Sequence, residues 1–139
     1  MTPEALAALH HRCFETPRPW SAAEFSGLLE GSGVFLTADE DNRGFALGRV
    51  IIDEVELLTL AVAPTARRQG IGRRLLAAFE RDAASRGARL AILEVSAANA
   101  PAIALYGATG YRQTGRRPGY YRAQNGSCED ALIYCKALS

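Results

Sequence analysis

The segment best suited to chemistry lies between Ala63 and Arg74, where an apolar stretch gives way to arginines and glycines. We expect a helix to begin at the two glycines, so that its first turn presents unpaired N–H groups and a positive dipole end. Glycines leave those groups open to a ligand, and flanking arginines add bidentate donors, which together suit a pyrophosphate. The residues predicted to bind it are Arg67, Arg68, Gln69, Gly70, Ile71, Gly72 and Arg73.

Other interpretations of this segment are a plain strand-to-helix turn with solvated arginines, or one of two nucleotide-binding loops. A Walker A loop needs Lys and then Ser or Thr after its last glycine, but Arg73 and Arg74 follow here. A dinucleotide fingerprint needs a third glycine where this chain has Leu75. Neither nucleotide motif is therefore present.

The elements that must position this loop can be read from the periodicity of the chain. Capping residues and spacing predict helices over 3–15, 21–31 and 70–86 and a helix from Asn99, with Ile103, Leu105 and Tyr106 inside it. Alternating or continuous apolar runs predict strands over 34–38, 45–52, 54–63, 89–95, 111–114 and 131–135. We expect residues 115–126 to form loop and turns. Interleaved helices and strands indicate a mixed α/β sheet within one domain spanning residues 1–139.

Composition excludes several classes of function. The 139 residues are 48% hydrophobic, and 16 basic residues against 15 acidic ones leave a net charge of +1. This balance argues against a nucleic-acid coat or a polybasic membrane anchor. The longest nearly apolar stretch, Leu57–Pro64, is far short of a membrane span. We expect no signal peptide. The cysteines form no ligand cluster and His10 and His11 point apart on one helix, so we also expect no metal site and three unpaired thiols in a reducing cytoplasm.

The loop resembles the acetyl-CoA pyrophosphate loop of the GNAT acetyltransferases, whose pattern Arg/Gln-x-x-Gly-x-Gly/Ala is matched by Arg67, Gly70 and Gly72. The resemblance extends to the preceding strand and to the run Asn99…Ala-Leu-Tyr106…Gly-Tyr. It implies a central, mostly antiparallel sheet with a splayed parallel pair, flanked by about four helices. It also implies acetyl-CoA as cosubstrate. The further residues expected to bind it are Leu60, Ala61, Val62, Asn99 and Tyr106, with a backbone N–H near Ala61 or Val62 stabilising the thioester oxygen.

Within that family, shorter matches resemble the bacterial branch that acetylates the N-terminal alanine of ribosomal proteins. They are Pro19-Trp20-Ser21, Leu93-Glu94-Val95, Tyr120-Tyr121 and Glu129-Asp130-Ala131. One departure is Ser96, where the branch leads us to expect Arg. The implied partners are acetyl-CoA and a protein N-terminus in the cytoplasm, with no nucleic acid and no membrane. The matches specify no oligomeric state.

Glu94 is the candidate general base. Alternation alone favours an outward-facing Glu with Leu93 and Val95 turned inward, whereas the resemblance places the base at this position. Burial of a carboxyl group in this apolar strand would raise its pKa toward a value useful for accepting a proton.

Tyr106 is the candidate acid that protonates the departing thiolate. At helical spacing a tyrosine is ordinarily a core aromatic, and the context after Asn99 favours the catalytic role. Proton transfer from a free tyrosine to a free thiolate is uphill by about 2 kcal/mol, which a catalysed reaction tolerates.

Three aromatic residues are candidates for the acceptor side: Trp20, Tyr120 and Tyr121. The two tyrosines could clamp a peptide end or simply cover a sheet edge, and Trp20 could pack between the first two helices.

The function predicted is acetyl transfer to a protein N-terminal α-amine, and the acceptor predicted is the N-terminal alanine of a ribosomal protein. A protein α-amine has a pKa of roughly 7.7–8.0 and a lysine about 10.4, so lysine starts about 3.4 kcal/mol worse near neutral pH. Acetylation of a small amine or a lysine, and a non-catalytic acyl-CoA-binding module, remain alternatives. A nucleic-acid-binding function is not favoured, because this chain has no base-reading motif.

Overall fold

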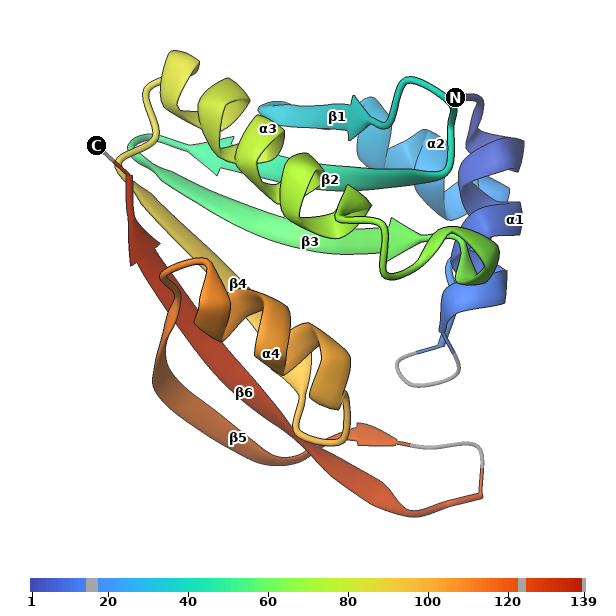
Figure 1. The fold of residues 1–139 in the computed structure, drawn as a ribbon, viewed down its shortest axis with the longest axis vertical. Helices are drawn as coiled ribbons and strands as arrows, with labels where there is room; N and C mark the ends of the chain where they lie inside the picture. The colour runs from blue at the N-terminus through green and yellow to red at the C-terminus, as the bar shows by residue number, and fades with distance from the viewer. Residues whose placement is uncertain (15–17, 123–124, 139) are drawn as a thin grey trace.

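A six-stranded sheet forms the centre of the protein in a computed structural model that describes residues 1–14, 18–122 and 125–138 (Figure 1). The strand order is β1-β2-β3-β4-β6-β5, and every neighbouring pair is antiparallel except β3 and β4. The strands are β1 (Val34–Ala38), β2 (Gly44–Ile51), β3 (Glu54–Val62), β4 (Leu90–Ser96), β5 (Arg112–Arg122) and β6 (Cys128–Ala137).

Helices begin where the sequence places capping residues. They are α1 (Pro3–Cys13), α2 (Ala22–Leu29), α3 (Ile71–Ser85) and α4 (Ala100–Ala108), with a 3₁₀ turn, η1 (Pro64–Ala66), after β3. Ser21 and Glu24 form the predicted capping box of α2, and the Asn99 side chain accepts from the Ala102 N–H at the start of α4. The four helices and the mixed sheet of the described residues confirm the predicted fold class.

Two apolar clusters lie on opposite faces of the strand pair β2–β3. Phe45 and Leu47 of β2 pack with Leu6, Leu9 and Phe25 of α1 and α2. Ala46, which alternation turns to the other face, belongs to the cluster that contains Phe79 of α3. Figure 1 shows α3 crossing in front of β2 and β3, and α4 lying along β4 and β6.

Gly48 of β2 allows α3 to approach the sheet closely. A Cβ at this position would lie 2.5 Å from the ring of Phe79 and 2.9 Å from that of Phe35. Those two rings stack with centroids 5.6 Å apart. The glycine therefore sets the depth of α3 and, with it, the position of the loop that precedes α3.

The parallel pair β3–β4 separates partway along its length. The β2–β3 register shifts at Leu47/Gly48, which leaves Leu58 as an extra residue in β3. Pairing of β3 with β4 ends at Leu57↔Leu93, so the remainder of each strand diverges (Figure 1). A bulge bends its strand and interrupts the ladder. The predicted splay is thus present, and it opens the sheet at the end where the Arg67–Arg73 loop lies.

The prediction for the last two strands was wrong in extent. Strands were expected over 111–114 and 131–135 with a loop between them, but β5 continues to Arg122 and β6 begins at Cys128. Pro118 and Gly119 are accommodated by a register shift between Arg117 and Tyr121 rather than by a turn. The Asp130 carboxylate stabilises this irregularity by accepting from the Gly119 N–H at 2.8 Å and from Arg116. The Pro118-Gly119 pair therefore lies at a bulge within β5 and does not end the strand.

The other expected boundaries agree with the structure to within two residues, except where they fall outside the described residues. The predicted end of the first helix at Glu15 and its break at 16–17 lie outside them; α1 is described to Cys13. No helix in the described part of the chain is long and apolar enough to cross a membrane.

His10 and His11 point apart as expected, but His10 is buried whereas His11 is exposed. His10 Nδ1 accepts from the Trp20 backbone N–H at 3.0 Å, and its Nε2 lies 2.9 Å from Thr59 Oγ1. These bonds join α1 to the segment before α2 and to β3. Burial lowers the pKa of His10 to about 4, with a smaller opposing contribution from Glu24.

We predict that His10 makes folding pH-dependent between about pH 6.5 and pH 4. Its pKa is lower in the folded state than in the unfolded state, so the unfolded state takes up the proton first as the pH falls. The free energy of unfolding should decrease by roughly 3 kcal/mol across this window. Denaturant titrations at several pH values check this. His10→Gln should flatten the pH dependence and His11→Gln should preserve it; equal slopes in both variants would contradict the assignment.

Candidate active site

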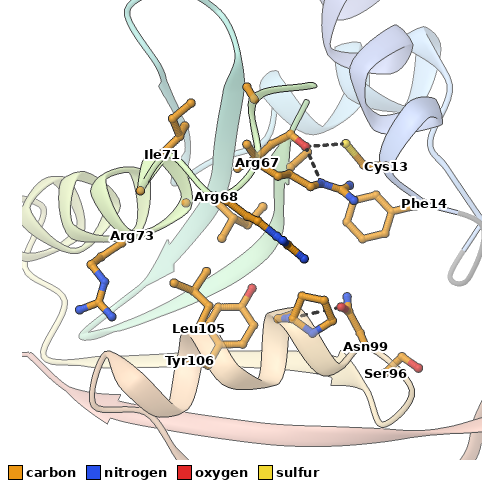
Figure 2. Close-up of a pocket in the computed structure, with 18 of the residues that line it drawn as sticks. Cys13, Phe14, Arg67, Arg68, Ile71, Arg73, Ser96, Asn99, Leu105 and Tyr106 are labelled. Atoms are coloured by element: carbon orange, nitrogen blue, oxygen red, sulfur yellow. Dashed lines mark hydrogen bonds between the residues drawn. The ribbon is translucent and has the colours of Figure 1, made fainter. Parts of the chain in front are cut away.

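A cavity of about 850 Å³ lies between the diverging ends of β3 and β4 and the loop before α3 (Figure 2). It brings together almost all the residues predicted to bind the cosubstrate: Leu60, Ala61, Val62, Arg67, Arg68, Gly70, Ile71, Gly72, Arg73, Asn99 and Tyr106. Gln69 does not line it, and the Gln69 carbonyl instead accepts from the Arg74 side chain at 3.1 Å. One predicted contact is therefore not part of the cavity wall.

The basic wall of the cavity is the N-terminus of α3. Gly70 caps the helix in the left-handed conformation (φ 75°) and supplies no side-chain bond to the first-turn N–H groups. Arg68 has a φ of 65°, an unfavourable conformation for a residue with a Cβ. Figure 2 shows its side chain reaching across the cavity toward Asn99, while Arg67 turns back to the Val62 carbonyl. Open N–H groups beside arginines are the donors that an anion requires at a helix N-terminus.

Backbone groups of β3 form another wall. The Ala63 N–H donates to the Arg43 carbonyl on the β2 side of the strand. Because N–H groups alternate along an antiparallel edge, those of Leu60 and Val62 point to the opposite side, toward the opening left by β4. The Val62 carbonyl on that side accepts from Cys13 Sγ and Arg67 Nε, both at 3.3 Å. Between the two residues suggested for the oxyanion contact, the geometry favours Val62 over Ala61.

A smaller chamber of about 90 Å³ joins the main cavity where the two strands separate. Its distinctive walls are Glu94, Tyr121, Trp20 and His10. The residues shared by the chamber and the main cavity are Phe14, Leu60, Ser96, Asn99, Ala102 and Tyr106. A group held beside Glu94 therefore meets the contents of the main cavity near Tyr106.

Glu94 faces this chamber rather than open solvent. Leu93 and Val95 are buried, as alternation predicts, but the other face of β4 is also covered, which leaves the Glu94 side chain 27% exposed. Its Oε1 lies 3.3 Å from the Arg117 guanidinium of β5. The burial expected from the sequence is therefore partial, and the carboxylate keeps access to a ligand.

Tyr106 is buried, with 6% of its surface exposed, and it lines both spaces. Burial raises its pKa above the ordinary value, and Tyr121 adds to the shift. The pKa of Tyr121 is raised to about 12, chiefly by burial and then by the nearby Glu94 carboxylate. Both phenols therefore keep their protons near neutral pH, so Tyr106 is available as a proton donor and not as a phenolate base.

The three aromatic residues predicted for the acceptor side have different surroundings. Tyr121 lines the chamber. Tyr120 is 53% exposed, lines neither space, and lies under the Arg117 guanidinium 5.1 Å from its ring centroid. Trp20 lines the chamber and also stacks on His10 with ring centroids 5.0 Å apart. The structure thus brings two of the three to the chamber: Tyr121 from strand β5, and Trp20 from the segment before α2.

Several lining residues were not among those predicted for the site. Cys13 and Phe14 reach the cavity from the end of α1, and Glu129 reaches it from β6. Ser96 Oγ donates to Glu129 Oε1 at 2.6 Å and accepts from the Ala98 N–H at 3.1 Å. These residues meet only because distant elements converge, so spacing along the chain could not reveal them. Within the described residues, no three His, Cys, Asp or Glu side chains gather as metal ligands would.

Sequence comparison identifies relatives over most of this chain. Residues 4–111 match the family described as the Acetyltransferase (GNAT) family. The [Ribosomal protein bS18]-alanine N-acetyltransferase of Salmonella typhimurium is 39% identical over 124 residues, covering 87% of this chain and 82% of that protein.

Structural comparison gives the same picture. The crystal structure of the ribosomal-protein-S18-alanine N-acetyltransferase from Escherichia coli superposes with a TM-score of 0.86 at 34% identity, covering 99% of this chain and 88% of the other. Arabidopsis thaliana NAA60 in complex with acetyl-CoA has a TM-score of 0.83 at 22% identity, covering 99% of this chain and 93% of that one, and shares the fold.

We predict that Arg68→Gln weakens CoA binding about five- to tenfold, because the variant loses a charged donor for the pyrophosphate. Arg81, exposed on α3, provides the matched control, since Arg81→Gln removes the same charge away from the cavity. Isothermal titration with CoA measures both. Equal weakening by the two variants would indicate a general charge effect and not a site at Arg68.

Proposed function

Because the chain belongs to the GNAT acetyltransferase family, we propose that it transfers the acetyl group of acetyl-CoA to the N-terminal α-amine of a protein. The observation that carries the proposal is the meeting of two spaces at Tyr106: a large cavity with an anion-binding wall and a small chamber beside Glu94. Acetyl-CoA, when bound, supplies an acetyl thioester. A chamber of about 90 Å³ admits a small group such as the first residue of a peptide.

The main cavity has the features that acetyl-CoA requires. The α3 N-terminus and Arg68 provide donors for a pyrophosphate, and the open edge of β3 offers backbone groups for an amide-bearing arm. The Val62 N–H is then the donor proposed to stabilise the thioester oxygen. The backbone donors among them are held in place by the helix and the strand.

Glu94 is proposed as the general base. It lines the chamber, keeps part of its side chain accessible, and is held by Arg117. A protein α-amine is already partly unprotonated near neutral pH, so a carboxylate acting directly or through one water suffices. Lysine is disfavoured by about 3.4 kcal/mol from the difference in pKa alone.

Tyr106 is proposed to donate the proton to the departing sulfur. Its raised pKa makes donation more uphill than between free groups. A thiolate held in the same buried surroundings is destabilised as well, because desolvation penalises both anions. The two effects offset each other, and the neutral phenol is available as the donor.

The acceptor we propose is the N-terminal alanine of a ribosomal protein, acetylated in the cytoplasm. Support comes from relatives at 37–39% identity that are named for this reaction and that this chain matches over 82% of their length. The narrow chamber is consistent with alanine as the first residue.

We predict that Glu94→Gln lowers kcat/KM for a peptide with a free N-terminal alanine by about 10²–10⁴-fold, because proton transfer loses its base. CoA release is the assay, and isothermal titration should show that the variant still binds CoA. Glu56→Gln is the control, since Glu56 is 49% exposed on β3 and paired with Arg49. Tyr106→Phe should also lower kcat.

A panel of acceptors, tested by CoA release, distinguishes the proposed α-amine acceptor from a lysine, a small amine and a non-catalytic module. It contains the alanine peptide, the same peptide blocked at its N-terminus and carrying lysine, and polyamines. Turnover of the free alanine peptide alone supports the proposal. Turnover of polyamines or lysine alone overturns the acceptor assignment, and tight CoA binding without any turnover favours a non-catalytic module.

A further inference from the structure

Charge is divided between the two sides of the main cavity. The side formed by the loop and α3 carries Arg67, Arg68 and Arg73, whereas the side formed by β4 and β6 carries Ser96 and Glu129 (Figure 2 shows the arginines and Ser96). A pyrophosphate is attracted to the first side and repelled by a carboxylate on the second. The Glu129 side therefore suits a cation, which the cosubstrate does not supply.

Glu129 differs from the neighbouring carboxylates in having no arginine partner. Glu94 is paired with Arg117 at 3.3 Å, and Asp130 with Arg116 at 2.6 Å. Glu129 forms no ion pair with any residue that the structure describes, and the remaining positions of the chain hold no Lys or Arg. Its one recorded side-chain bond comes from the Ser96 hydroxyl, a neutral donor.

Ser96 holds this carboxylate in a defined place relative to Glu94. Ser96 is 4% exposed, and its hydroxyl also accepts from the Ala98 N–H, so the donor is fixed. Glu94 and Ser96 are two residues apart on β4, on the same face and about 7 Å apart along the strand. Alternate residues of an extended peptide are separated by about the same distance.

Resting on the proposed function, we propose that Glu129 is a specificity-determining residue that binds a Lys or Arg side chain at the second or third position of the acceptor peptide. The acceptor amine lies at Glu94, and the following residues extend past Ser96 toward Glu129. The basic side chain supplies the cation that Glu129 lacks in the free protein. Ser96 acts as a positioning residue for this contact.

The test compares kcat/KM within sets of three peptides that share an N-terminal alanine and carry Arg, Gln or Glu at one position, with one set for position two and another for position three. Wild type should prefer Arg over Gln about five- to tenfold at one position or the other, and the preference should shrink as salt is added. Glu129→Gln should bring the ratio close to one, and Glu129→Arg should favour the Glu peptide. Glu56→Gln should keep the wild-type ratio.

The outcomes separate the two proposals. Turnover of all three peptides of each set with equal kcat/KM in wild type overturns the role of Glu129 and leaves the proposed acetylation standing. No turnover of any free α-amine peptide overturns the proposed function and, with it, this inference. If Glu129→Gln fails to fold, the charge reversal Glu129→Arg still tests the residue itself, and equal kcat/KM for the peptides in wild type still overturns its role.

Discussion

The early end of pairing between β3 and β4 is the constraint on which the rest of the structure depends. One extra residue, Leu58, bends β3 and stops the parallel ladder at Leu57↔Leu93. A continuous sheet would have paired the backbone groups of Leu60 and Val62 and closed the space beneath them. Because the ladder stops, those groups face a cavity, and the loop before α3 and the start of α4 converge on it from two sides.

Packing on both faces keeps this open end in place. On one face, Gly48 lets Phe79 lie against Phe35, which fixes α3 on β2. On the other, His10 links α1 to Thr59 of β3 and to the backbone of Trp20. Loss of the hydrogen-bond ladder between β3 and β4 would ordinarily weaken the sheet. The contacts on its two faces hold β3 in place where it no longer pairs with β4.

Electrostatics then divides the opening into functional regions. The α3 N-terminus and its arginines favour an anion, while β4 carries Glu94 and β6 carries Glu129 and Asp130. Arginines of β5 neutralise two of these carboxylates. Burial raises the pKa of Tyr106 and Tyr121, so two neutral phenols lie between the regions of opposite charge. This arrangement suits a site that binds an anionic group on one side and a basic group on the other.

The sequence by itself determined the elements whose signals are local. Caps at Ser21 and Asn99, and the glycines at the start of α3, depend on hydrogen bonds and backbone conformations within a few residues, so the helices and the glycine-containing loop before α3 were predictable. Only the tertiary structure decided how far β5 extends, because the Pro-Gly bulge is stabilised by Asp130 from another strand. The tertiary structure also decided that Glu94 faces a chamber and that Glu129 has no basic side chain as a partner among the described residues. Burial and pairing between residues of different elements depend on which elements meet, and no spacing along the chain encodes that.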